Sequence, residues 1–196
     1  MKTLVIVDVQ NDFIKGGSLE VPEGQNVIEP INNIIKDYDL VIATKDWHPK
    51  DHVSFASNHK DKNIGDVIKV NGTDQTLWPD HCIQNSFGSD FPSNLDVSNV
   101  QKIIFKGNDS SIDSYSGFFD NGNIRATGLS EYLKQNGVLQ VDCVGLATDY
   151  CLKYTALDSL SEGFQTRVII DCIRGIDEKG CEMALEEMKS KGIKLI

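Results

Sequence analysis

The sequence predicts an α/β protein: a doubly wound, three-layer α/β/α sandwich built on a mainly parallel sheet. Three observations support this prediction. Short, uniformly apolar runs such as Leu4–Val7 have the pattern of strands that are buried on both faces, which is typical of parallel sheets. Segments with apolar residues at helical spacing stand between these runs. Polar residues follow directly after the runs, at the strand ends where open parallel sheets bind ligands.

The predicted elements alternate along the chain. Apolar, β-branched runs predict strands at residues 4–7, 40–44, 103–105, 138–144 and 168–170, with a further terminal strand at 193–196. Helical periodicity predicts helices at about residues 24–35, 127–135, 149–160 and 177–191. Pro30 falls in the first turns of the first helix, where proline is tolerated, and Thr127 is a suitable cap for the second. Right-handed crossovers would place helices on both faces of the sheet.

Residues 49–100 show no regular periodicity and contain three of the four histidines. So long an irregular stretch in a compact domain is usually a functional loop region. We therefore expect one domain spanning residues 1–196, with a binding loop region at about residues 46–100.

Composition excludes several classes of function. The net charge of -10 argues against nucleic acid or an anionic membrane as a partner. No apolar run approaches the roughly 18 residues of a membrane-spanning segment, and the first apolar run is too short for a signal-peptide core. The five scattered cysteines do not form a disulfide framework. We expect a protein of the reducing cytoplasm, and the sequence leaves a homo-oligomer open.

A candidate nucleophile lies at Cys151. It follows the predicted strand 138–144 and a short turn, and it stands in the first turn of the next predicted helix. Unpaired N–H groups and the helix dipole at that position favour a thiolate. Asp8 and Lys106 follow other strands on the same edge of the sheet, so they could act as base and as partner of the thiolate. Considered alone, Asp8 could instead be a structural carboxylate, and Lys106 could be a solvated lysine after a strand.

A candidate metal site begins at Asp46 and His48, two residues apart on one side of an extended segment. His52 follows four residues later, and His81 comes from the long loop. Carboxylate and imidazole together suit zinc, manganese or iron(II) with positions left open for water. The alternative is that these are surface histidines in a polar loop.

Taken together, these motifs resemble the isochorismatase-like cysteine hydrolases and, within them, the nicotinamidase family. The resemblance runs nearly end to end. Its anchors are Asp8-Val9-Gln10-Asn11-Asp12-Phe13, Asp46-Trp47-His48-Pro49, Asp51-His52-Val53-Ser54-Phe55-Ala56, Trp78-Pro79-Asp80-His81-Cys82, Lys106-Gly107, Asp113-Ser114-Tyr115-Ser116-Gly117-Phe118 and Gly145-Leu146-Ala147-Thr148-Asp149-Tyr150-Cys151. Two positions depart from the family pattern: Gly117 stands where alanine is frequent, and Asp80 is at a variable position.

The resemblance implies hydrolysis of nicotinamide to nicotinate and ammonia, a step in recycling NAD breakdown products, and also hydrolysis of pyrazinamide. It implies one divalent metal ion, with zinc expected and iron or manganese as alternatives. The implied site residues are the catalytic triad Asp8, Lys106 and Cys151, the metal ligands Asp46, His48 and His81, and His52, which is a ligand in some members only.

The resemblance also implies a cis peptide bond between Leu146 and Ala147, with the N–H groups of Ala147 and Cys151 forming an oxyanion hole. Phe13, Trp78 and Ala147 would surround the pyridine ring. Three alternatives remain at this point. The chain could hydrolyse another amide or carbamoyl compound, it could be a metal-hydroxide hydrolase in which Cys151 is a bystander, or it could be an inactive binding protein of the same fold.

Overall fold

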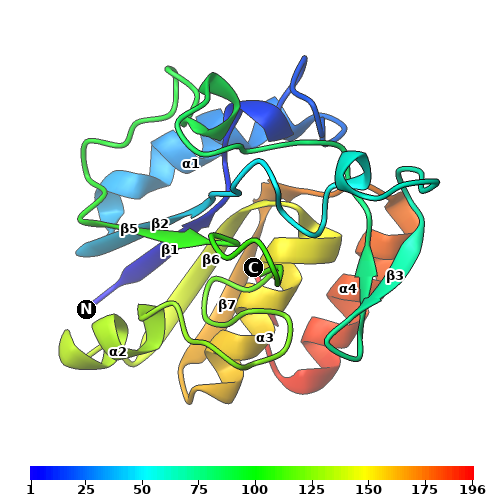
Figure 1. Ribbon diagram of the computed structural model, residues 1–196. Coiled ribbons are helices and arrows are strands. Elements are labelled where there is room, and N and C mark those ends of the chain that lie inside the picture. The colour runs from blue at the N-terminus through cyan, green and yellow to red at the C-terminus, as the bar shows by residue number, and fades with distance from the viewer.

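The computed structural model describes residues 1–196 and is centred on a six-stranded sheet in the order β5-β2-β1-β6-β7-β8 (Figure 1). Every neighbouring pair in this sheet is parallel. The predicted fold class is therefore confirmed. The strands are β1 (Thr3–Val7), β2 (Leu40–Asp46), β5 (Lys102–Lys106), β6 (Gln140–Leu146), β7 (Gln165–Arg174) and β8 (Lys194–Leu195).

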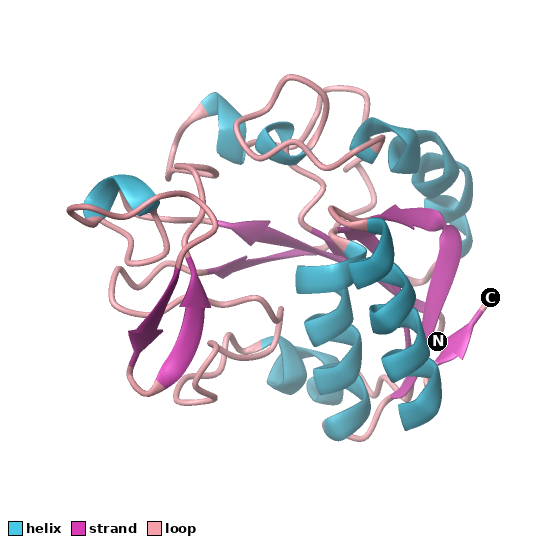
Figure 2. Ribbon diagram, turned by 90° about the vertical axis from the view of Figure 1, so that its right-hand side faces the viewer, coloured by secondary structure: helices cyan, strands magenta, loops and turns pink.

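Helices cover both faces of the sheet. Figures 1 and 2 show α1 (Ile28–Ile34) on one face, and α3 (Lys153–Ser161) and α4 (Glu178–Lys191) on the other. The helix α2 (Leu129–Gln135) contributes to the same core as α3 and α4. The four helices agree with the predicted ones except in their ends. Short 3₁₀ turns cover Asn11–Phe13, Gly24–Val27, Ile35–Asp37, Ala56–Asn58 and Phe87–Ser89.

Two hydrophobic cores result from the alternation of side chains along each buried strand. In β1, Leu4 and Ile6 belong to the core beneath α1, whereas Val5 and Val7 belong to the core beneath the other helices. Both faces of β1 are therefore buried, which explains why its sequence is uniformly apolar. None of the helices combines the length and the apolar character that a membrane crossing requires.

Two sequence expectations were wrong in detail. Residues 49–100 contain an antiparallel hairpin, β3 (Val67–Val70) and β4 (Thr73–Thr76), which stands apart from the main sheet (Figure 2). Its turn is Asn71-Gly72, with both φ angles positive at 50° and 84°. An Asn-Gly pair is the strongest short hairpin signal, because both residues accept that conformation. The expectation that residues 49–100 are irregular overlooked this Asn-Gly pair.

The second correction concerns the segment before α3. The predicted helix from residue 149 does not form there, because Thr148–Leu152 makes a wider π-type turn and α3 begins at Lys153. Within this turn Tyr150 has non-helical angles, with φ at -127° and ψ at -107°. Cys151 therefore lies in a kinked turn that precedes the helix. We call Thr148–Leu152 the nucleophile turn below.

Candidate active site

The candidate site lies where four strands end. In β2 and β5, Asp46 pairs directly with Lys106 in the parallel register, and in β1 and β6, Val7 pairs with Gly145. Asp8 follows β1, and the nucleophile turn follows β6. Residues more than 140 positions apart in the chain are thus brought to one edge of the sheet, as the sequence predicted.

Lys106 is at the centre of the predicted triad. Its ammonium nitrogen lies 2.8 Å from Asp8 Oδ2 and 3.4 Å from Cys151 Sγ, and it donates to the Ser114 carbonyl at 2.9 Å. It also forms an ion pair with Asp46 Oδ1. The reactive atoms of Asp8, Asp46 and Cys151 lie within 4.8 Å of one another. The structure therefore brings the three triad candidates into contact distance around one buried cation.

Burial controls the protonation of this cluster. It raises the pKa of Asp8 to about 6, although the charge of Lys106 lowers it. The Thr44 hydroxyl donates to Asp8 Oδ1 at 2.6 Å and also favours the charged carboxylate. A carboxyl group with a pKa in this range can both accept and return a proton near neutral pH.

The protonation of Cys151 differs from the expectation that a thiolate would be favoured. Burial raises the pKa of the Cys151 thiol well above its usual range, and the opposing charge of Lys106 does not overcome this effect. The carboxylates of Asp46 and Asp8 add to the increase. The resting form is therefore a thiol, and its reaction requires a base close by.

Backbone geometry at the end of β6 brings the nucleophile turn close to β1. The Leu146–Ala147 peptide bond is cis, as the resemblance implied. Gly145 has a φ of 111°, and a β-carbon there would lie 2.1 Å from the Val7 carbonyl oxygen. Only glycine allows this close approach. Ala147 and Cys151, the two predicted oxyanion-hole residues, both line the pocket described below.

The predicted metal ligands converge on one point. Asp46 Oδ2 lies 3.6 Å from His48 Nε2 and 3.8 Å from His81 Nε2. The other ring nitrogens donate to backbone carbonyls, His48 Nδ1 to Gly107 at 2.8 Å and His81 Nδ1 to Pro79 at 2.7 Å. These bonds leave the Nε2 lone pairs facing Asp46, which is the arrangement found in metal-binding histidines.

The donor set therefore fits a divalent cation. His48 Nε2 is buried and has no hydrogen-bond partner, which is costly unless another group binds it. Burial acts to raise the pKa of Asp46, but the charge of Lys106 beside it holds that pKa well below its usual range. Gly107 permits the arrangement, because a β-carbon at this position would lie 2.3 Å from the His48 ring.

His52 is placed differently. Its Nε2 donates to the Ile112 carbonyl at 3.3 Å, and its Nδ1 accepts from the Ser54 hydroxyl at 2.7 Å. Burial lowers the pKa of His52 to about 4, so the ring is neutral and both nitrogens are occupied. His52 packs against His48, with ring centroids 4.1 Å apart. His52 therefore packs beside the predicted ligand His48 with both of its ring nitrogens hydrogen-bonded, although its ligand atoms also lie within 4.8 Å of those of His48 and Asp113.

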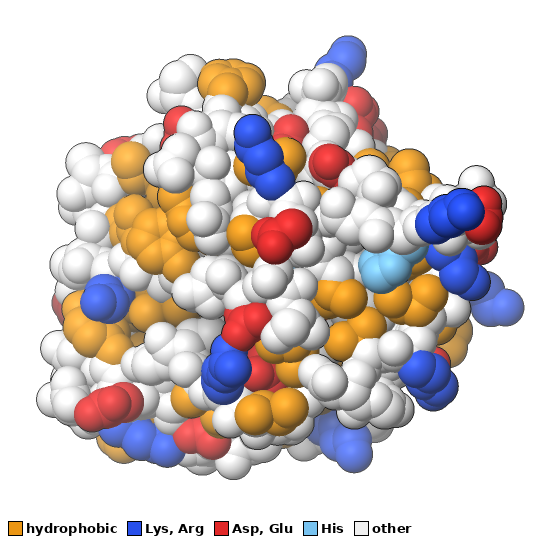
Figure 3. Space-filling model, viewed as in Figure 1, with side chains coloured by type: hydrophobic (Ala, Val, Ile, Leu, Met, Phe, Trp, Pro, Cys, Tyr) orange, Lys and Arg blue, Asp and Glu red, His pale blue; other side chains and the backbone are white.

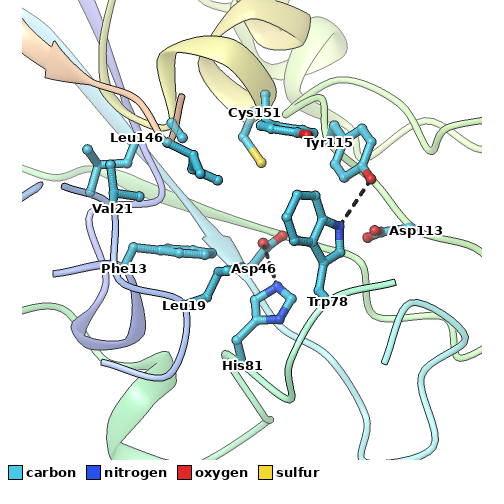
Figure 4. Close-up of a pocket in the computed structure, with 13 residues that line it drawn as sticks. Phe13, Leu19, Val21, Asp46, Trp78, His81, Asp113, Tyr115, Leu146 and Cys151 are labelled. Atoms are coloured by element: carbon cyan, nitrogen blue, oxygen red, sulfur yellow. Dashed lines mark hydrogen bonds and ion pairs between the residues drawn. The ribbon is translucent and has the colours of Figure 1, made fainter. Parts of the chain in front are cut away.

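A narrow pocket opens onto the thiol. Figure 4 shows Phe13 and Trp78 on opposite sides, the sulfur of Cys151 pointing into the space between them, His81 across that space from the sulfur, and Asp46 between the sulfur and His81. Trp78 donates its indole N–H to the Tyr115 hydroxyl at 3.2 Å. Ten of the thirteen lining residues are hydrophobic. Sequence reasoning did not predict a place in the pocket wall for Leu19, Val21, Asp113, Tyr115, Tyr150 and Ile176, and it named Leu146 only for its cis peptide bond.

Comparison with known proteins agrees with this geometry. The family model described as the isochorismatase domain matches residues 2–196. The chain belongs to the isochorismatase family. Among its curated relatives, the nicotinamidase of Acinetobacter baylyi is 41% identical over 194 residues, which cover 98% of this chain and 91% of the relative.

Solved structures give the same result. A nicotinamidase/pyrazinamidase from Acinetobacter baumannii superimposes with a TM-score of 0.97 at 42% identity, over 100% of this chain and 95% of the other. The pyrazinamidase of Pyrococcus horikoshii in complex with zinc has a TM-score of 0.82 at 38% identity, over 100% and 98% of the two chains. The predicted family and the predicted kind of enzyme, an amide hydrolase, are confirmed.

Proposed function

We propose that this chain hydrolyses nicotinamide to nicotinate and ammonia through a thioester on Cys151. The observation that carries the proposal is a buried Asp8–Lys106–Cys151 cluster at one end of an aromatic slot between Phe13 and Trp78 (Figure 4). The relatives named nicotinamidase support the substrate, because they match this chain over nearly its full length. Pyrazinamide, a ring of the same shape, is a proposed second substrate.

The slot suits a flat, neutral aromatic amide. Such a ring gains from contact with aromatic side chains on both of its faces and needs few polar partners. Figure 4 shows His81 across the slot from the Cys151 sulfur, with Asp46 between them. A pyridine ring could thus place its nitrogen toward His81 and its amide carbon toward Cys151.

In the first half-reaction Asp8 accepts the proton of the Cys151 thiol, and the thiolate forms a bond to the amide carbon. Lys106 stabilises the negative sulfur at a distance of 3.4 Å. The N–H groups of Ala147 and Cys151 are the proposed donors to the oxyanion, a contribution of about 3 kcal/mol for one such donor. The carbon–nitrogen bond then breaks, and protonated Asp8 returns its proton to the departing ammonia.

In the second half-reaction water attacks the thioester. Asp8 accepts one proton from this water, the carbon–sulfur bond breaks, and Asp8 returns that proton to the sulfur; the second water proton stays on the product acid, which leaves and ionises to nicotinate in solvent. The same carboxyl group therefore serves twice, which its pKa of about 6 permits. Asp46 holds Lys106 in place in both steps through their ion pair.

We propose that Asp46, His48 and His81 hold one divalent metal ion, and that His52 supports His48 without binding the ion. Zinc is the first candidate because carboxylate and imidazole donors suit it and because one relative was solved in complex with zinc; iron and manganese are the alternatives. When bound, such an ion would supply a Lewis acid for the ring nitrogen.

We also propose that residues 1–196 work as one domain in a reducing compartment, for which the cytoplasm is the candidate. The sheet is continuous from β5 to β8, and all five cysteines are free. A free thiol at Cys151 is required for the proposed chemistry.

The test is release of ammonia from nicotinamide by the purified protein. We expect Cys151→Ala to lose at least about 10⁴-fold in kcat. Cys172→Ala, which removes a buried thiol outside the pocket, should keep the wild-type rate. Activity that survives in Cys151→Ala would overturn the thioester mechanism.

Two further samples separate the remaining alternatives. A chelated sample to which zinc, iron(II) or manganese is returned shows whether metal is needed and which ion restores the rate. A panel of other primary amides tests the substrate. Turnover of one of these, with none of nicotinamide, would keep the triad and replace the substrate assignment.

A further inference from the structure

Asp149 lies in the nucleophile turn, two residues before Cys151, and its side chain bonds to a distant part of the chain. Its Oδ1 accepts the N–H of Ile176 at 3.0 Å, and its Oδ2 accepts the N–H of Asp177 at 3.0 Å. The residue is only 8% exposed. One buried carboxylate therefore ties the turn that carries the nucleophile to the loop between β7 and α4.

The loop is closely packed around this carboxylate. A β-carbon on Gly175 would lie 2.8 Å from Asp149 Oδ1 and 2.0 Å from Cys181 Sγ, and one on Gly180 would lie 3.2 Å from Asp149 Oδ2. The backbone N–H groups and the positive end of the α4 dipole balance the charge of Asp149. Hydrogen bonds of this kind, to a charged acceptor, are stronger and shorter than those to a neutral one.

The two parts joined by Asp149 form different walls of one pocket. Tyr150 and Cys151 line it from the turn, Ala147 lines it from the position just before the turn, and Ile176 lines it from the loop. The turn is irregular, because Tyr150 interrupts its helical conformation and α3 begins only at Lys153. Backbone bonds from Tyr150 and Leu152 to the Ala147 carbonyl hold the turn locally, and the Asp149 carboxylate adds the contact that joins it to the Ile176 loop.

We propose that Asp149 is a positioning residue that fixes the Cys151 thiol relative to the Ile176 wall, and so sets the geometry in which a bound amide meets the sulfur. The proposal deepens the proposed function and rests on it for the identity of the amide. The effect on the thiol itself does not depend on the substrate.

The test compares Asp149→Asn with Asp177→Asn. In Asp149→Asn the side-chain oxygen can still accept one of the two backbone N–H groups. The NH₂ group then faces the other backbone N–H, and because both are donors no hydrogen bond forms there. Asp177 is the matched control because it caps the same helix, accepting the Gly180 N–H at 2.7 Å, and is not part of the turn. Both substitutions remove one negative charge at the N-terminus of α4.

Two rates are measured on each variant at matched metal content. One is the single-turnover rate of thioester formation, and the other is the rate at which iodoacetamide alkylates Cys151. We expect Asp149→Asn to change both rates, with acylation reduced roughly 10- to 100-fold because a displacement of about 1 Å has that consequence. Asp177→Asn keeps an oxygen that can accept the Gly180 N–H and loses only a charge at the helix N-terminus, so it should lower Tm slightly and leave both rates within about twofold.

Asp149→Glu keeps the charge and displaces the acceptor oxygens by one methylene. If charge at the helix N-terminus were the only role of Asp149, the glutamate variant would restore both rates, and the proposal would be wrong. Equal losses of Tm in the two asparagine variants with unchanged rates would overturn it as well. If the protein did not hydrolyse nicotinamide but Asp149→Asn still altered the alkylation rate of Cys151, the positioning role would stand and the substrate assignment would be wrong. A failure of the proposed function can thus be distinguished from a failure of the positioning role.

Discussion

The two sides of the pocket are built in different ways. On the sheet side, Asp8, Lys106 and Cys151 follow strand ends, and the parallel register places them together. On the loop side, His81 and Trp78 come from an irregular segment in which single hydrogen bonds fix each ring. Under the proposed function, the sheet side positions the groups that react, whereas the loop side positions the rings and lone pairs that bind.

Asp46 belongs to both sides. Its Oδ1 pairs with Lys106, and its Oδ2 faces His48 and His81. Gln10 fixes its backbone on both edges, accepting the Asp46 N–H at 2.8 Å and donating to the Asp46 carbonyl at 2.9 Å. Binding and catalysis therefore share one carboxylate. The comparison predicts that changes on the sheet side act on kcat, and that changes on the loop side act on metal affinity or KM.

The largest effect is expected on the sheet side from Asp8→Asn. Its amide cannot accept the thiol proton, so kcat should fall by about 10²- to 10⁴-fold, the usual contribution of a general base. Metal content, measured by elemental analysis, should stay at the wild-type level, because Asp8 lies outside the Asp46–His48–His81 cluster. A change of KM alone would place Asp8 among the binding residues and contradict the comparison.

The next effect concerns the metal cluster and separates two neighbouring histidines. His48→Ala removes a nitrogen that faces Asp46, and we expect metal affinity to fall by more than about 100-fold. His52→Ala removes a ring that bonds to Ile112 and Ser54, and the loss should stay within about tenfold, as for a supporting residue. Titration of both apo-proteins with zinc gives the ratio of their zinc dissociation constants. Equal losses would make His52 a ligand.

The same difference explains how much could be predicted from sequence. Strands buried on both faces leave a continuous apolar run, and a reactive residue at its end, such as Asp8 or Lys106, is readily identified. The loop walls have no such signal. Tyr115 and Ile176 line the pocket, and each is held there in part by a hydrogen bond to a partner 27 or more residues away in the chain. Those bonds depend on tertiary contacts that no local pattern records.

The nucleophile turn shows a second limit. Its residues have helical spacing, but the kink at Tyr150 delays α3 to Lys153. Dipole arguments from the sequence predicted a thiolate at Cys151, whereas burial raises the pKa of that thiol well above its usual range. Desolvation of a site cannot be judged until the packing around it is known.

A third prediction uses the acid limb of the pH profile. Asp8 must be ionised to accept a proton, and its pKa is about 6, so kcat/KM should fall about tenfold per pH unit below that value. Thr44 donates to Asp8 and favours the ionised form. Thr44→Val should therefore move the limb to higher pH, and a shift to lower pH would show that Asp8 is not the titrating group.

The smallest effect tests the loop side. Tyr115→Phe removes the acceptor of the Trp78 indole N–H, which leaves this wall of the slot less firmly oriented. Loss of one such hydrogen bond is worth about 1 kcal/mol, so KM for nicotinamide should rise roughly fivefold with kcat nearly unchanged.

Trp78→Phe should raise KM as well, because it shortens the wall. In the double variant the phenylalanine at position 115 should add little further increase, since the Trp78 N–H is already gone and only the weaker contact from Gln75 at 3.3 Å is still lost. Additive effects would mean that Tyr115 acts on the substrate directly, and a fall in kcat would mean that the loop side also positions the reacting groups.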